Sequence, residues 1–152
     1  VDVDLPALLH VRRSHADVIA RLKRYRLARG GIIHAFAGSF EEAREYQKLG
    51  FKLGLGGAAT WPQALRLRKV LPRLGLDGVV LETDAPDIPP HWLYTTAEQR
   101  AAGVPQGRNA HAELPRIAQC IAELRGIPLE TLAQAALSNS LMALPKLGAL
   151  LV

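Results

Sequence analysis

Histidine and carboxylate side chains stand at the ends of three apolar segments of this sequence. His10 closes "LPALLH", His34 closes "GGIIH", and Glu82 and Asp84 close "GVVLETD". Because the carboxyl ends of parallel strands lie at one edge of a sheet, these side chains are expected to converge. Two imidazoles and a carboxylate suit a divalent cation such as zinc or manganese. A lone histidine at a strand end is more often a hydrogen-bonded core residue, so both interpretations stay open at this point.

Weaker candidates for substrate binding lie close to these strand ends. Arg12 follows His10 by two positions and would face the same way, toward an anionic substrate group; the alternative is an ordinary surface arginine. Gly38 and Ser39, in "AFAGS", could offer backbone amides to a phosphate. Glycines also serve as plain turns, so this second signal is weak alone.

Two tryptophans are expected to flank the same edge, and two further histidines lie in the segments after the strands. Trp61 and Trp92 could each stack on a base, with helix packing and loop anchoring as the alternatives. His15, at a helix start, and His91, in a long loop, are expected to be surface residues.

Hydrophobic periodicity places these residues on alternating strands and helices. The segments that predict strands cover residues 5–11, 30–36, 51–57 and 78–84. Helices are predicted over residues 14–25, 39–50, 60–71, 110–126 and 128–144, and a loop over 85–107. Four βα units with an additional carboxyl-terminal helix predict an α/β fold with a parallel sheet. An open sheet fits this order, and so does half of a (β/α)8 barrel, which needs about 250 residues in full.

Several local signals predict where the helices begin. Ser39 and Glu42 have the spacing of a capping box. Thr60 is expected to cap the third helix and Asn109 the fourth. Pro115 should fall in the first turn of that fourth helix or bend it.

Composition limits the class of protein. At 152 residues, 49% hydrophobic and 22% charged, the sequence predicts one soluble globular domain over residues 1–152. No apolar run approaches the roughly 20 residues of a membrane span, and no basic-then-apolar leader opens the sequence. Cys120 is the one cysteine, which excludes an internal disulfide and is compatible with the reducing cytoplasm. The net charge of +5 favours polyanionic partners, although a solvated helix face is an equal alternative.

Three segments, in their order and spacing, resemble the carboxyl-terminal half of the TatD family of metal-dependent hydrolases. They are "LPALLHVRRSHADV", "GIIHAFAGSFEEAREYQKLGFKLGLGG" and "LDGVVLETDAPDIP". In addition, "GRNAH" resembles the family's Arg-Asn-Glu-Pro loop, and "LSNSLMAL" its closing helix. The resemblance covers nearly the whole sequence. It implies a TIM barrel of the amidohydrolase type and two-metal hydrolysis of phosphodiesters, with 3′ to 5′ exonuclease action on single-stranded DNA.

The resemblance also implies roles for individual residues. His10 and His34 correspond to metal ligands, and Asp84 to the carboxylate that binds metal and orients or deprotonates the attacking water. Glu82 would lie close to the substrate or behind the ligands, and Arg12 could clamp the phosphate. Asn109, in "GRNAH", would be a further substrate-binding residue. Magnesium, zinc or manganese would lower the pKa of a bound water to roughly 7.

The sequence departs from the family in what it lacks. The family's first-half ligands, a His-x-His strand and a glutamate on the fourth strand, have no counterpart here. Residues 91–106 look like an insertion, and Ala110 and His111 replace the usual acid and proline after Asn109, which leaves that loop's substrate contacts open. We therefore expect a half-barrel that alone binds metal weakly and has little activity.

Exposed sheet edges in a half-barrel favour association, so a homodimer that completes an eight-stranded ring, or aggregation, is expected. Two other functions stay open. The same fold could hydrolyse another phosphoester, ester or amide, or it could be a non-catalytic basic module that binds nucleic acid or a partner.

Overall fold

The centre of the computed structural model, which describes residues 4–150, is a four-stranded sheet of parallel strands in the order β1-β2-β3-β4. The strands are β1 (Ala7–His10), β2 (Gly31–His34), β3 (Phe51–Leu55) and β4 (Val79–Leu81). All four predicted strands are present and neighbours in sequence are neighbours in the sheet, which confirms the parallel α/β prediction. The ends of the predicted unit, residues 1–3 and 151–152, lie outside the described residues.

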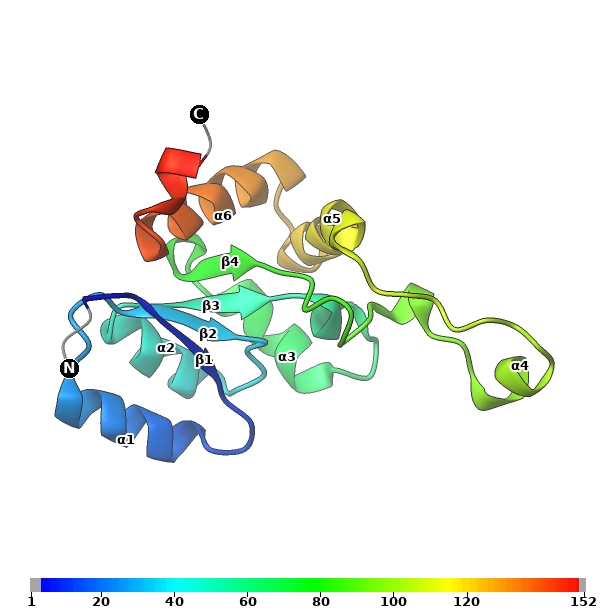
Figure 1. Ribbon diagram of the computed structural model, residues 1–152, viewed down its shortest axis with the longest axis horizontal. Coiled ribbons are helices and arrows are strands. Elements are labelled where there is room, and N and C mark those ends of the chain that lie inside the picture. The colour runs from blue at the N-terminus through cyan, green and yellow to red at the C-terminus, as the bar shows by residue number, and fades with distance from the viewer. Residues whose placement is uncertain (1–3, 151–152) are drawn as a thin grey trace.

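The helices form two groups around the sheet (Figure 1). Helices α1, α2 and α3 lie below the sheet in this view, whereas α5 and α6 lie above it, next to β4. The helices are α1 (His15–Tyr25), α2 (Phe40–Lys48), α3 (Leu65–Val70), α4 (Ala97–Ala101), α5 (Leu114–Arg125) and α6 (Leu129–Ala143). None of the helices within residues 4–150 is long and apolar enough to cross a bilayer.

The two faces of the sheet differ in how they are covered. Alternate side chains point to opposite faces, so Ile33 and Leu53 face the helices, where both are fully buried. Leu8 and Ile32 are paired across β1 and β2 and share the other face with the two strand-end histidines. The end of α6 covers Ile32, but Leu8 is 66% exposed. This partly open face is the one that would line the inside of a closed barrel.

Several predicted helix ends are confirmed. The Ser39 hydroxyl accepts a hydrogen bond from the Glu42 backbone N–H, and the Glu42 carboxylate accepts one from the Ser39 backbone N–H, as a capping box requires. Pro115 lies in the first turn of α5, where its missing N–H costs no helical bond. The Cys120 thiol is half-buried, and burial raises its pKa, in agreement with a structural thiol.

Two predicted helix caps are wrong. Thr60 does not begin a helix over residues 60–71; it ends a 3-10 turn, and α3 starts only at Leu65. The Thr60 hydroxyl instead donates to the Gly57 carbonyl and accepts from the backbone N–H of His91. Asn109 does not cap α5 either, because its side chain turns back to the loop after β4. Both residues bond to segments distant in sequence, which a local capping signal does not anticipate.

The loop predicted over residues 85–107 contains a short helix. Thr96 and Gln99 form a second capping box, which starts the five-residue helix α4. The helix was missed because it has no buried face and therefore no hydrophobic periodicity.

Candidate active site

The two strand-end histidines and the two carboxylates come together as predicted. His10 and His34 are paired residues at the ends of β1 and β2, and their ring centroids lie 5.6 Å apart. Glu82 and Asp84 follow β4, two strands away from His34. Both carboxylates nevertheless reach His34, so the gap across β3 must be open.

A glycine on β3 opens that gap. A Cβ atom at Gly54 would collide with the Glu82 carboxylate, so Glu82 can occupy this place only because residue 54 has no side chain. Through the space, Glu82 Oε2 lies 3.1 Å from His34 Nδ1, and Glu82 Oε1 accepts a 2.6 Å hydrogen bond from the Ala35 backbone N–H. Glu82 therefore holds the imidazole of His34 from behind, in one orientation.

The other nitrogen of His34 faces Asp84. His34 Nε2 lies 3.0 Å from Asp84 Oδ1, and both side chains are about three-quarters buried or more. His34 thus stands between two carboxylates, one on each ring nitrogen. In metal sites, a carboxylate on one ring nitrogen commonly orients the histidine, and the other ring nitrogen is then directed at the metal. Glu82 has the first position here, and Asp84 lies beside the second nitrogen.

Backbone strain is concentrated at the same place. Arg13, Ala35, Asp84 and Ile88 all have positive φ angles, of 56°, 47°, 56° and 44°, and all four line one cleft. Residues with side chains avoid this region because the Cβ atom crowds the backbone, at a cost of roughly 1–3 kcal/mol each. Such conformations are tolerated where the surrounding structure holds them, and they often accompany functional sites.

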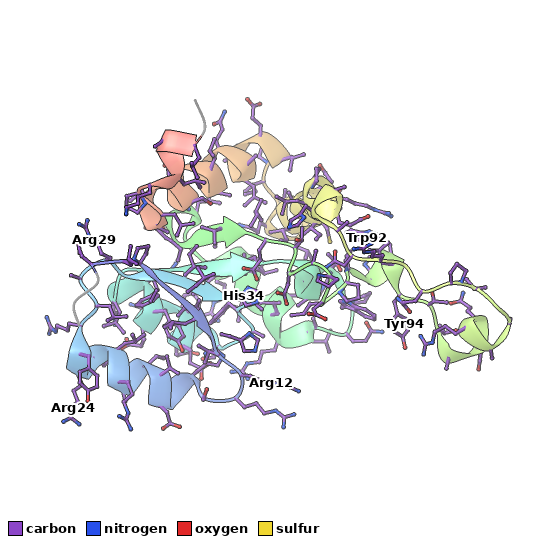
Figure 2. All side chains as sticks on the ribbon, in the orientation of Figure 1. Arg12, Arg24, Arg29, His34, Trp92 and Tyr94 are labelled. Atoms are coloured by element: carbon purple, nitrogen blue, oxygen red, sulfur yellow. The ribbon has the colours of Figure 1, made fainter. Side chains whose placement is uncertain are left out.

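The cleft has a volume of about 590 Å³ and opens at the carboxyl ends of the strands. Arginine side chains dominate its charged lining: Arg12, predicted to meet an anion, is joined by Arg13 and Arg66. Figure 2 shows Arg12 on the turn after β1, beyond the edge where His34 lies. Asp84 and Asp87 are the carboxylates in this lining. The cleft therefore pairs carboxylate and imidazole groups with cations suited to an anionic ligand.

Three of these lining residues were not predicted. Arg13, an exposed residue with a left-handed backbone conformation, lines the cleft, and Arg66 reaches it from α3, where it lies 3.4 Å from the Glu42 carboxylate. His15, expected at the surface, is half-buried, and its Nδ1 lies 3.1 Å from the hydroxyl of Tyr46. The "RRSH" stretch is visibly basic in the sequence, but no local pattern predicts that these side chains line the cleft.

Burial shapes the pKa values around His15. Burial lowers the pKa of His15, and the Arg66 charge lowers it further, against an opposing effect of Glu42. Burial together with the Glu42 charge raises the pKa of Tyr46 to about 12. Burial opposes ionisation of Glu42, but hydrogen bonds from Ser39 and the nearby cations bring its pKa below the ordinary value. At neutral pH Glu42 is thus a stable anion that can orient Arg66.

Three residues predicted to contact substrate lie elsewhere. The backbone N–H and hydroxyl of Ser39 are engaged in the capping box, and Gly38 packs against the Phe36 ring. Asn109 is buried, and its Nδ2 donates to the backbone carbonyls of Thr83 at 2.8 Å and Asp87 at 2.5 Å. Asn109 therefore fixes the position of the loop that carries Asp84.

The donor types at this site fit a divalent cation, but their number falls short. Imidazole nitrogen and carboxylate oxygen are available from His10, His34 and Asp84, which suit zinc, manganese or related ions. Within residues 4–150, however, no three His, Cys, Asp or Glu side chains are gathered closely enough to hold an ion. A cation here would need donors beyond this arrangement.

Comparison with known proteins identifies the family. A model of the family described as TatD related DNase matches residues 1–145. This chain belongs to the TatD-related DNase family. The uncharacterized metal-dependent hydrolase YjjV of Escherichia coli K12 is 39% identical over 137 residues, which are 90% of this chain and 49% of that protein. The 3′-5′ ssDNA/RNA exonuclease TatD of Cronobacter sakazakii is 35% identical over 128 residues, 82% of this chain and 46% of that protein.

Solved structures agree on the fold. The crystal structure of E. coli YjjV superposes with a TM-score of 0.81 at 37% identity, covering 93% of this chain and 51% of that one. A TatD family hydrolase from Entamoeba histolytica, 22% identical, shares the fold with a TM-score of 0.70 over 50% of its chain. The chain thus spans about half the length of the TatD-family proteins it matches, and its four βα units correspond to part of a TIM barrel.

Proposed function

We propose that this chain supplies half of the active site of a metal-dependent hydrolase that cleaves phosphodiester bonds, and that the substrate is single-stranded DNA degraded from its 3′ end. The observation that carries the proposal is one cleft lined by His10, Asp84 and three arginines, with His34 held next to it between Asp84 and Glu82. Several relatives are named 3′-5′ ssDNA/RNA exonucleases, which supports this choice of substrate. Cytoplasmic location stays a prediction.

The metal-binding residues would be His10, His34 and Asp84. A bound divalent cation would supply a water of lowered pKa and would neutralise the phosphate oxygens. Magnesium, zinc and manganese are all compatible with these donors, and two ions are expected in a complete site. Glu82 would accept a hydrogen bond from His34 Nδ1–H, which leaves the lone pair of Nε2 on the side of Asp84, free to bind a cation.

The remaining residues would act on the substrate. Asp84 can accept a proton from an attacking water on the cleft side of His34. Arg12, Arg13 and Arg66 would hold the phosphate through charge-assisted hydrogen bonds, and Glu42 orients Arg66 for this task. Ser39 is assigned no part, because the capping box occupies its backbone N–H and hydroxyl, and Gly38 is not among the residues that line the cleft.

A non-catalytic nucleic-acid-binding function is the second candidate. The shortage of metal donors within residues 4–150 favours it, because arginines can hold a strand without any cleavage. Hydrolysis of another ester or amide would use the same donors and differs only in substrate.

We further propose that a second copy completes the site. Strands β1 and β4 are the two edges of the sheet, and Leu8 stands exposed on β1. Beside β4, an apolar groove of about 410 Å³ is lined by Leu81 and side chains of α5 and α6. In such a dimer, β4 of each copy would pair with β1 of the other copy. The two four-stranded sheets would then form one closed ring, with the carboxyl ends of all strands on the same rim. His10, His34 and Asp84 of both copies would then face one central space.

The first test is degradation of 5′-labelled single-stranded DNA with magnesium, manganese or zinc, against EDTA. We expect metal-dependent shortening that Asp84→Asn abolishes and that Asp17→Asn, the same substitution on the exposed side of α1, leaves intact. Binding of the DNA without shortening, by folded protein, would refute hydrolysis by this chain and support the non-catalytic candidate. Equal turnover of small esters would refute the choice of substrate.

The second test is the mass in solution. Light scattering should give twice the 16.5 kDa of one chain. Leu8→Glu should produce monomers that no longer bind metal tightly. Leu65→Glu should leave the dimer and its metal binding intact, although Leu65 on α3 is equally exposed at 65%. A well-folded monomer that binds metal stoichiometrically and tightly would contradict both the dimer and the incomplete site.

A further inference from the structure

Residues 91–108 form an arm that projects from the end of the molecule at which the strands end (Figure 1). Its base is held by side chains on both sides. The Trp61 indole N–H donates to the Pro89 carbonyl at 2.9 Å, and the Trp92 indole N–H donates to the Glu113 carboxylate at 2.7 Å. The base of the arm is therefore attached at a defined angle to the rest of the chain.

The arm is also closed internally. The Gln106 amide donates to the Leu93 carbonyl at 2.9 Å, and the Thr95 hydroxyl donates to the Pro105 carbonyl at 3.0 Å. The Arg100 guanidinium donates to the Thr95 carbonyl as well. These bonds join the outgoing and returning segments, so the arm presents its side chains from an ordered backbone.

Two aromatic rings at the base of this arm each lie beside a guanidinium group. Arg116 lies over the Trp92 ring, 4.3 Å from its centroid, and Arg100 lies 5.9 Å from the centroid of Tyr94. The Tyr94 ring packs edge-on against Trp61 at 5.2 Å. Packing and the indole hydrogen bonds account for the half-buried positions of Trp61 and Trp92. Tyr94, by contrast, leaves 48% of its surface exposed.

The arm is continuous with the cleft. Ile88 lines the cleft, and Trp92 follows four residues later, a path of at most about 14 Å. Figure 2 places Trp92 and Tyr94 at the base of the arm, with Trp92 above the ribbon and Tyr94 below it in this view, at the end of the molecule to which the strands point. A chain-like ligand whose end lies in the cleft could extend along this surface.

We propose that Tyr94, with Arg100, binds the unpaired bases and phosphates of a single nucleic-acid strand whose 3′ end enters the cleft. An exposed ring beside cations is the combination that binds single strands, because every base has a face that stacks and every linkage carries a charge. This inference rests on the proposed function, since the cleft determines which end of the strand is held.

The test is binding of fluorescein-labelled oligothymidylate, measured by anisotropy in EDTA so that no cleavage occurs. Tyr94→Ala should weaken the Kd about fivefold or more, the effect of losing one stacked base. Tyr94→Phe keeps the ring and should bind like the original chain, which separates stacking from folding. The matched control is Tyr25→Ala: Tyr25 on α1 is 61% exposed and has Arg24 5.4 Å from its centroid, but Figure 2 shows Arg24 at the far end of the molecule.

A second probe separates this inference from the proposed function. Bis(p-nitrophenyl) phosphate is too short to reach the arm, so its metal-dependent hydrolysis should be unchanged in Tyr94→Ala. A fully paired duplex of the same length should bind equally to both variants, because its bases are not free to stack. Unchanged oligothymidylate binding by Tyr94→Ala, or an equal loss in Tyr25→Ala, would overturn the arm surface while leaving hydrolysis intact. Absent hydrolysis with a Tyr94 effect on binding would instead refute the proposed function alone.

Discussion

Replacing Asn109 by alanine should loosen the loop that carries Asp84, and a second asparagine provides the control. Asn109 is 2% exposed, and its Nδ2 donates to two carbonyls of that loop. Asn139 is 4% exposed, and its Nδ2 donates to the carbonyls of Leu76 at 2.6 Å and Val79 at 2.7 Å, which attaches α6 to the start of β4. The two residues make equivalent bonds at opposite ends of β4.

The structure sets the expected magnitudes. A buried carbonyl that loses its partner costs about 1–3 kcal/mol, less what water recovers, so Asn139→Ala should lower the free energy of unfolding by roughly 2–4 kcal/mol. Among residues 4–150, Oδ1 of Asn109 is buried without a hydrogen-bond partner, and its removal offsets part of the loss. Asn109→Ala should therefore cost only about 1–3 kcal/mol. For a chain of this size, these values correspond to decreases in Tm of roughly 4–16 °C and 2–12 °C.

Thermal unfolding and hydrogen exchange measure the two effects. Asn109→Ala should speed exchange in residues 83–88, whereas Asn139→Ala should speed exchange near residues 76–80 and in α6. Faster exchange in the same segments for both variants would refute the view that Asn109 specifically positions Asp84. A larger stability loss for Asn109→Ala than for Asn139→Ala would refute the offset by Oδ1.

Three further outcomes follow from local contacts. Ser39→Ala removes the cap of α2 and should cost about 1 kcal/mol in urea unfolding, whereas Thr96→Ala, the same type of change in the exposed α4, should cost less; equal costs would contradict this. Because burial raises the pKa of Tyr46 from 10.0 to about 12, its contribution to stability is complete below pH 10 and is lost as the pH rises toward 12. Tyr46→Phe should flatten the stability profile in that window, and an unchanged slope would assign the loss to other groups. Burial lowers the pKa of His15 below 6.5, so stability should fall as the pH falls below that value, and His15→Gln should reduce this acid sensitivity. A steeper acid loss in His15→Gln would reverse the argument.

Local sequence patterns were sufficient for the secondary-structure order. The apolar segments predicted all four strands, and because parallel strands end at one edge, they also predicted that His10, His34, Glu82 and Asp84 would converge. These predictions succeed because alternation and helical spacing are properties of neighbouring residues.

The same local reasoning failed where a residue bonds across the molecule. Thr60 and Asn109 have the chemistry of helix caps, but their side chains find partners more than 20 positions away along the chain. Arg66 and His15 gave no local sign that they line the cleft, because their directions depend on how α3 and α1 pack beside the strand ends.

The sequence by itself therefore determined the family, the parallel βα order and the convergence of two histidines and two carboxylates at the strand ends. Only the tertiary structure decided that Glu82 reaches His34 through the space left by Gly54, and that Asn109 holds the loop of Asp84. The physical reason is the range of the interactions. Periodicity and capping act within a few residues, whereas a hydrogen bond between distant segments exists only once the chain has brought its two atoms within about 3 Å.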